Sequence, residues 1–156
     1  MAEKESYIGI SEFEELMKGK LKTSFEECIK DMRRQTRFFY TDIINESKKF
    51  DGTTKLFLIH TPTTIIFTAR VKCNSEGCEI NMVYTNPKFR GQGYCSKSIQ
   101  KIVKKIRGKK IFLEVNKKNA AAISCYEKAG FVKTKTVGTA DTMVYKKPGA
   151  TRKKNK

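Results

Sequence analysis

The stretch that decides the fold of this chain reads Val83-Tyr84-Thr85-Asn86-Pro87-Lys88-Phe89-Arg90-Gly91-Gln92-Gly93-Tyr94-Cys95. An apolar strand runs into a glycine-rich turn, and the turn opens a helix that we expect to begin at Ser96. Glycine lets the backbone turn sharply without a Cβ clash. The free N–H groups of a first helical turn point outward, at the positive end of the helix dipole. The stretch therefore predicts a place where phosphates can bind, with Ser96 and Lys97 adding a hydroxyl and an ammonium.

The turn also has a plainer explanation, which is a tight strand-to-helix connection that binds nothing. Two common phosphate-binding patterns do not fit it. The third glycine of the dinucleotide fingerprint is replaced by Ser96, and the Gly-Lys-Ser/Thr sequence of the Walker motif is absent. The turn alone leaves both explanations open.

A second segment, from Asn119 to Phe131, predicts a helix that ends at Gly130. Asn119, Ala122 and Tyr126 are spaced by three and four residues, so they share one helix face. The small Ala122 would leave a groove between an amide and a phenol. Such a groove suits a ligand that carries amide groups and ends in a leaving atom. Alternatively, Asn119 is only a helix cap and Tyr126 a core aromatic.

Hydrophobic periodicity predicts a mixed α/β sheet with helices packed on it. Two helices are expected within residues 10–35, followed by an apolar run at 38–44 and a polar link to residue 52. Residues 1–146 are expected to form a single domain, and the basic residues 147–156 a disordered tail. The remaining expected elements are strands at 55–60, 63–71 and 78–85, a helix at 96–106, a strand at 111–115, a helix at 120–129, and a hairpin of strands at 131–137 and 142–145.

Charge is distributed unevenly along the 156 residues, which carry a net charge of +17. Residues 1–51 hold 10 Lys or Arg and 11 Asp or Glu, whereas residues 52–156 hold 23 and 5. The cationic part favours an anionic partner, such as nucleic acid, an acidic membrane surface or a nucleotide cofactor. No apolar run is long enough to span a bilayer, and the polar N-terminus does not resemble a secretory signal. Five cysteines without regular spacing predict reduced thiols and a cytoplasmic, reducing location.

Together, the two segments resemble the acetyl-CoA site of the GNAT superfamily of N-acetyltransferases. The strand–loop–helix of that family carries Arg/Gln-x-x-Gly-x-Gly/Ala, and this chain has Arg90-Gly91-Gln92-Gly93-Tyr94-Cys95. Val83-Tyr84-Thr85-Asn86-Pro87 is similar to the family's lead-in to the loop. The stretch from Leu113 to Phe131 is similar to the second cofactor segment. The resemblance is strong over residues 78–146 and weak before them.

The resemblance implies a mostly antiparallel, mixed central sheet of the α/β (α+β) class, splayed between its fourth and fifth strands and flanked by helices. It implies acetyl-CoA as the cosubstrate, with no metal. It also implies transfer of the acetyl group to a primary amine by direct attack in a ternary complex.

The family also implies roles for matching residues. Tyr126 would protonate the departing CoA sulfur, Asn119 beside Ala122 would bond the pantetheine arm, and the Val83 N–H would polarise the thioester carbonyl. Main-chain groups of Met82, Val83 and Thr85 would pair with pantetheine. The pyrophosphate would be held by backbone N–H groups of Arg90, Gly91, Gln92, Gly93, Tyr94 and Cys95, together with Ser96.

The base that deprotonates the amine is the main departure from the family pattern. Many members carry a glutamate where this chain has Asn81, which cannot take a proton. Glu79 lies two residues earlier on the same strand face and is our candidate base, acting through water. Alternatively, Glu79 is a solvated carboxylate without a catalytic role. Cys95 and Cys125 lie near the expected site, where buried, inert thiols are expected rather than an acetyl-cysteine relay.

The acceptor is predicted from the acidic N-terminal part, because acceptor walls in this family come largely from there and from the last hairpin. A small cationic amine such as a polyamine fits these acids, with a protein lysine or N-terminus as the alternative. A non-catalytic CoA-binding protein or a basic nucleic-acid-binding protein is the alternative of a different class. No membrane contact is expected, and nucleic acid is expected only in non-specific contacts of the tail. Either a monomer or a homodimer is compatible with the sequence. The acidic residues of the N-terminal part on which the acceptor prediction rests are Glu12, Glu14, Glu15, Glu26, Glu27 and Asp31.

Overall fold

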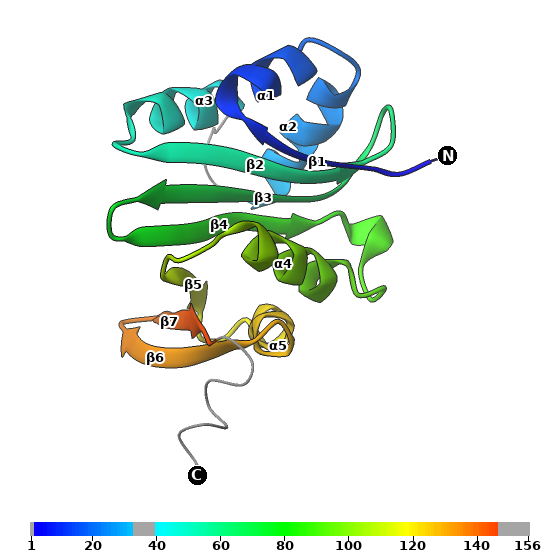
Figure 1. Cartoon of the computed structure of the whole chain (residues 1–156). Coiled ribbons are helices and arrows are strands. Elements are labelled where there is room, and N and C mark those ends of the chain that lie inside the picture. Colours follow the sequence, from blue (N-terminus) through cyan, green and yellow to red (C-terminus); the bar gives the residue numbers. More distant parts are fainter. Residues whose placement is uncertain (1, 33–39, 147–156) are drawn as a thin grey trace.

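A computed structural model describes residues 2–32 and 40–146 of the chain (Figure 1). The expected tail at 147–156 and part of the apolar run at 38–44 lie outside these residues. The strands are β1 (Lys4–Gly9), β2 (Thr53–His60), β3 (Ile65–Asn74), β4 (Gly77–Thr85), β5 (Ile111–Asn116), β6 (Phe131–Val137) and β7 (Ala140–Tyr145). The helices are α1 (Ile10–Leu16), α2 (Leu21–Met32), α3 (Tyr40–Lys49), α4 (Tyr94–Lys105) and α5 (Ala120–Lys128), with a short 3₁₀ turn at Pro87–Phe89.

The seven strands form one sheet in the order β1-β2-β3-β4-β5-β7-β6. Every neighbouring pair is antiparallel except β4 and β5, which run parallel. Only two register pairs join β4 to β5, namely Cys78 with Ile111 and Glu79 with Phe112. Beyond residue 79 the two strands diverge (Figure 1). The predicted mixed sheet, splayed between its fourth and fifth strands, is confirmed.

Two elements were missing from the expected order, which began with helices. β1 pairs with β2 along the edge of the sheet, and its residues are only half-buried or exposed, so it lacks the apolar alternation of an inner strand. α3 covers most of the expected apolar run at 38–44 and the first part of the polar link that follows it. Ile43, Ile44 and Ser47 are buried on one face of α3, but most of its other residues are polar, and no helix was expected there.

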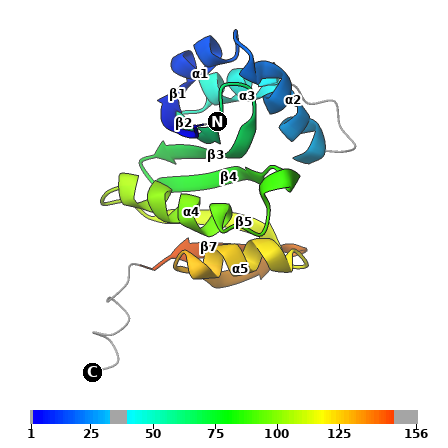
Figure 2. The same cartoon turned by 90° about the vertical axis from the view of Figure 1, so that its right-hand side faces the viewer.

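Helices cover both faces of the sheet, and β2 shows why. Leu56 and Leu58 pack into the core formed with α1, α2 and α3, whereas Phe57 and Ile59 pack into the core formed with α4 and α5. Alternate residues of a strand point to opposite faces, so an inner strand covered on both sides is apolar throughout. Figure 2 shows α1–α3 on one side and α4 and α5 on the other. Burying each such side chain contributes about 1.5–3 kcal/mol.

A β-bulge interrupts β4 where the strand leaves β5. Arg70 of β3 pairs with Asn81 and Thr68 with Tyr84, so Met82 and Val83 together oppose one residue of β3. Met82 has a φ of +52°, in the left-handed region. The bulge changes the alternation of side chains, because Val83 packs into the α4–α5 core and Met82 against the α1–α3 core.

We predict that Gly77→Ala destabilises the fold at the start of β4. Gly77 has a φ of +146°, and an added Cβ would lie 2.8 Å from the carbonyl oxygen of Lys110, which precedes β5. Gly138→Ala is the matched control, since Gly138 has a φ of +61° but nothing within 4 Å of its added Cβ. The control should lose about 1–2 kcal/mol from backbone strain, and Gly77→Ala about 1–3 kcal/mol more from overpacking. Urea unfolding measures both variants, and equal losses would contradict the prediction.

Candidate active site

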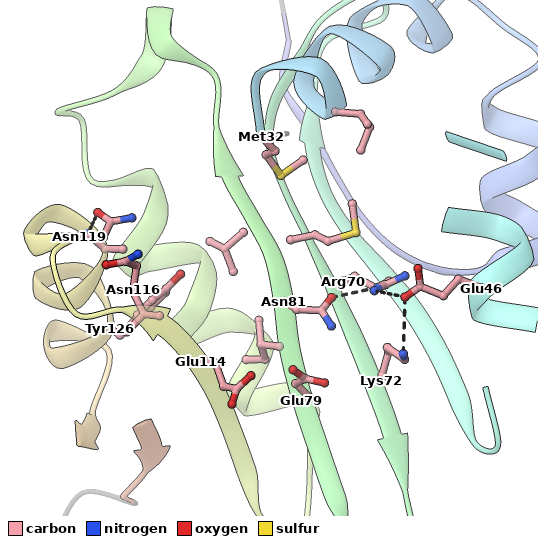
Figure 3. Close-up of a pocket in the computed structure, with 16 residues that line it drawn as sticks. Met32, Glu46, Arg70, Lys72, Glu79, Asn81, Glu114, Asn116, Asn119 and Tyr126 are labelled. Carbon is pink, nitrogen blue, oxygen red and sulfur yellow. Dashed lines mark hydrogen bonds and ion pairs between the residues drawn. The ribbon is translucent and has the colours of Figure 1, made fainter. Parts of the chain in front are cut away.

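A cavity of about 1000 Å³ lies where β4 and β5 separate (Figure 3). Its walls come from six elements: the C-terminal halves of α2 and α3, the polar face of β3, the diverging strands β4 and β5, and the first turns of α5. The lining residues are Ile29, Met32, Glu46, Arg70, Lys72, Glu79, Ile80, Asn81, Met82, Val83, Glu114, Val115, Asn116, Asn119, Ala122 and Tyr126. The structure thus brings together Glu79, Met82, Val83, Asn119, Ala122 and Tyr126 from the predicted site.

The β5-facing edge of β4 is open along this cavity. Residues 80–85 pair with β3 on one side, and in the described part of the chain none of them has a register partner on β5. Main-chain N–H and C=O groups on an unpaired edge can bond an extended ligand as a further strand would. Met82, Val83 and Thr85 all lie on this part of β4.

The glycine-rich turn has the backbone geometry that its sequence predicts. Gly91 and Gly93 have φ values of +79° and +82°. Gly93 is the N-cap of α4 and offers no side-chain cap, so the first N–H groups of the helix are free to bond a ligand. The helix begins at Tyr94, two residues before the expected Ser96. This turn is not part of the cavity lining described above.

Arg90 faces back toward the sheet and not out of the turn. Its Nε donates to the carbonyl oxygen of Thr85 at 2.9 Å, and its guanidinium lies 3.8 Å from Asp31 of α2. Its side chain therefore ties the turn to the end of β4, and its main-chain N–H donates to the carbonyl oxygen of Pro87 at 3.4 Å.

Asn119 and Tyr126 have the structural roles of the plainer explanation, and both also line the cavity. Asn119 is a helix cap, because its Oδ1 accepts from the N–H of Ala122 at 3.2 Å, and it also lines the cavity. Tyr126 belongs to the α4–α5 core, with its ring centroid 6.3 Å from that of Phe131. Only 6% of Tyr126 is exposed, yet its hydroxyl projects toward the gap between β4 and β5 (Figure 3). Burial raises the pKa of this phenol to about 12, so it stays protonated at neutral pH.

Charged side chains gather on the cavity face of the sheet. Arg70 is buried and its guanidinium lies 3.0 Å from Glu46 of α3, while Lys72 lies 4.0 Å from the same carboxylate. Glu79 and Glu114 project into the gap between the diverging strands (Figure 3), and neither forms an ion pair with any residue that the structure describes. Sequence reasoning found Glu79 but missed Glu114. The signal available was its alternation with the buried Leu113 and Val115 in a predicted strand.

The cysteines contradict the expectation of five reduced thiols. Cys95 of α4 is bonded to Cys125 of α5, and Cys73 is bonded to Cys78 across the β3–β4 turn. Folding brings the first turn of α4 against α5, so that residues far apart in the sequence pair with a Cα–Cα distance of 6.0 Å. Cys28 is the remaining thiol, and burial raises its pKa to about 12. The argument from free thiols for a cytoplasmic location therefore fails.

Comparison with known proteins agrees with this geometry. The sequence profile of the acetyltransferase (GNAT) family matches residues 10–131. A search of curated proteins finds no match. Similar solved structures include PaiA N-acetyltransferase from Thermoplasma acidophilum in complex with coenzyme A (20% identity, TM-score 0.62, covering 94% of this chain and 99% of that one). A variant of spermidine N-acetyltransferase SpeG from Vibrio cholerae is 15% identical, with a TM-score of 0.64, covering 91% of this chain and 94% of that one. N-acetyltransferase PseH from Campylobacter jejuni in complex with acetyl coenzyme A is 17% identical, with a TM-score of 0.63, covering 92% of this chain and 99% of that one.

The chain belongs to the acetyltransferase (GNAT) family. It is an acyltransferase that uses acetyl-CoA as cosubstrate, as the sequence resemblance predicted. In the described part of the chain, no helix is both long and apolar enough to cross a bilayer. Within the same residues, no three His, Cys, Asp or Glu side chains are grouped so that they could hold a metal ion.

We predict that the Cys95–Cys125 disulfide stabilises the fold more than the Cys73–Cys78 disulfide. The first closes a sequence separation of 30 residues and the second one of 5. By loop-closure entropy, replacing each pair with serine should cost about 3–4 and about 2 kcal/mol, respectively. Urea unfolding of the two double variants, each with and without dithiothreitol, measures the losses. A larger loss for the Cys73–Cys78 pair would contradict this ranking.

Proposed function

We propose that this acetyltransferase moves the acetyl group of acetyl-CoA to a primary amine by direct attack in a ternary complex. The preferred acceptor is a small cationic amine such as a polyamine. One observation carries the proposal: Tyr126, the open edge of β4 and the carboxylates of Glu79 and Glu114 border the same cavity. A thioester held along β4 would thus have a proton donor on one side and an anionic acceptor site on the other.

Cofactor binding would depend mainly on main-chain groups. The pyrophosphate would accept hydrogen bonds from the free N–H groups at the start of α4, where the helix dipole also favours an anion. The pantetheine arm would add to the edge of β4 at Met82, Val83 and Thr85, beside Asn119 and Ala122. The pyrophosphate contacts would come from Arg90, Gly91, Gln92, Gly93, Tyr94, Cys95 and Ser96.

The chemistry needs a stabilised oxyanion and a protonated leaving group. The amine nitrogen attacks the thioester carbon, and the Val83 N–H bonds the carbonyl oxygen as negative charge develops on it. The carbon–sulfur bond then breaks and the sulfur receives a proton from Tyr126, while the proton that the attacking nitrogen loses on becoming an amide restores the Tyr126 phenol. Because burial raises the pKa of Tyr126 to about 12, the phenol is present as the donor throughout the neutral range.

A primary ammonium has a pKa of about 10, so the amine must lose a proton before it attacks. We assign this proton to Glu79, through a water molecule. Glu79 is half-buried at the point where β4 leaves β5 and makes no ion pair with described residues. Asn81, at the position of the family's usual glutamate, cannot take the proton.

The charges of the cavity support a cationic acceptor. Arg70 and Lys72 both lie against Glu46, which leaves Glu79 and Glu114 as carboxylates without a cationic partner in the described chain. Two unpaired carboxylates attract a substrate with more than one ammonium. The spermidine N-acetyltransferase named above has the same fold, which is consistent with this class of acceptor.

We predict that Tyr126→Phe lowers kcat about 10²-fold or more, with the KM for acetyl-CoA within about twofold, since the ring is kept and only the proton donor is lost. Tyr145→Phe is the matched control. Its ring belongs to the same core, 5.6 Å from Phe131, but does not line the cavity. Release of free CoA thiol measures both variants. Equal turnover of the two would remove Tyr126 from the acid role.

Acceptor preference can be measured with spermidine, spermine, a simple monoamine, a lysine peptide and a peptide with a free N-terminus. We expect the highest kcat/KM for the polyamines. Glu79→Gln and Glu114→Gln should each lower polyamine kcat/KM about tenfold or more, and only Glu79→Gln should change the acidic limb of its pH profile. Glu76→Gln, in the exposed turn before β4, is the control. A higher kcat/KM for either peptide would identify a protein amine as the acceptor.

A further inference from the structure

We propose that Arg70 and Asn81 are positioning residues for the proton transfer that frees the acceptor amine. Arg70 would hold the Asn81 amide with its NH₂ group toward the cavity, where that group orients the water between the amine and Glu79. The inference rests on the proposed acetyl transfer and names two residues that the sequence did not assign to the site.

Arg70 is held from three sides beneath the cavity. Its Nε donates to Asn81 Oδ1 at 2.9 Å, one terminal nitrogen donates to Glu46 Oε1 at 3.0 Å, and the other donates to Ser47 Oγ at 3.4 Å. Its side chain is only 5% exposed. The guanidinium is therefore fixed in place, and Glu46 balances its charge (Figure 3).

This contact fixes which way the Asn81 amide points. A guanidinium can only donate hydrogen bonds, so the atom of Asn81 that faces Arg70 must be the oxygen. The NH₂ group then points the other way, into the cavity on the side of Glu79 (Figure 3). Nδ2 has no hydrogen-bond partner among the described residues. At the family's glutamate position, this chain thus presents a fixed pair of hydrogen-bond donors.

A donor at this position suits a relay water better than it suits the amine itself. A water that accepts from Asn81 Nδ2 keeps its second lone pair for a proton of the ammonium. One of its own protons can pass to the Glu79 carboxylate. The amine becomes neutral, Glu79 becomes protonated and the water is unchanged, so the step balances. The charged and titratable groups that face this position are Glu46 from α3, Arg70 and Lys72 from β3, Glu79 from β4, Glu114 from β5 and Tyr126 from α5.

The bulge supports the same arrangement. Met82 follows Asn81 directly and has a positive φ, and the register pair of Asn81 with Arg70 is the last one before the bulge. The main chain therefore holds Asn81 on the same face of the sheet as Arg70, while Val83 turns to the other face. One local distortion thus presents a side-chain donor to the cavity and the Val83 main chain to the thioester.

Four variants of the full chain test the inference. Asn81→Asp keeps the shape but removes the donor, and Asn81→Ala removes the whole amide. Arg70→Lys keeps a cation that can only donate hydrogen bonds. Arg70→Gln can also accept a hydrogen bond, so the Asn81 amide can adopt either orientation. Asn45→Asp, exposed on α3, is the control for added charge. Turnover is measured from pH 6 to pH 10 with spermidine and, in parallel, with a lysine peptide.

We expect Asn81→Asp, Asn81→Ala and Arg70→Gln to lower kcat at pH 7.5 at least about tenfold, with the KM for acetyl-CoA within about twofold. Their acidic limb should move to higher pH, since the amine then loses its proton without the relay. Arg70→Lys should retain more activity than Arg70→Gln, because its ammonium can only donate and so still requires the oxygen of Asn81 to face it. A merely structural role would not move the pH profile.

Two results would overturn the inference. Asn81→Asp with wild-type or higher turnover would show that position 81 works as a proton acceptor. Equal activity of Arg70→Lys and Arg70→Gln would show that the orientation of the amide does not matter. Thermal unfolding and CoA binding of each variant identify misfolding, and if Arg70→Gln fails to fold, the two Asn81 variants decide. Absence of transfer by the wild type to either acceptor would instead reject the proposed acceptors.

Discussion

The early end of the pairing between β4 and β5 is the constraint on which the site depends. Two register pairs hold the strands together, and then the parallel ladder stops. A parallel pair that continued would bond the edge of β4 and close the cavity. Because it stops, main-chain groups that would otherwise be satisfied inside the sheet become available to a ligand. The helices on both faces and the antiparallel pairs on either side keep the separated strands in place.

Much of this was predictable from the sequence, because it depends on local chemistry. Positive φ angles at Gly91 and Gly93 and the cap at Asn119 follow from the residue types, and the later strands and helices follow from their periodicity. β1 was missed because it shows no clean apolar repeat, and α3 because few of its residues are apolar. β1 is stabilised by its pairing with β2, and α3 by packing two isoleucines on α1 and α2, so both depend on tertiary contacts.

The less predictable features of the site depend on contacts between distant segments. Arg70 and Asn81 meet because β3 and β4 pair in one register, and the bulge at Met82 breaks that register just beyond them. No residue type in the sequence predicts a bulge at this position. Glu114 lines the same cavity as Glu79 because β5 pairs in parallel with β4 just before the two strands diverge. The cysteine pairs likewise follow from the packing of α4 on α5 and from a tight turn, neither of which composition reveals.

The bond between Cys95 and Cys125 has a consequence for substrate length. It joins the first turn of α4 to the residue next to Tyr126, so the two helices cannot slide past one another. Under the proposed assignments, it sets by a covalent link the span between the anchor of the diphosphate and the hydroxyl at the sulfur. Pantetheine has a fixed number of atoms, so a fixed distance between the start of α4 and the Tyr126 hydroxyl suits a cofactor arm of one length. With the bond cleaved, the helices could separate, and the match would rest on packing alone.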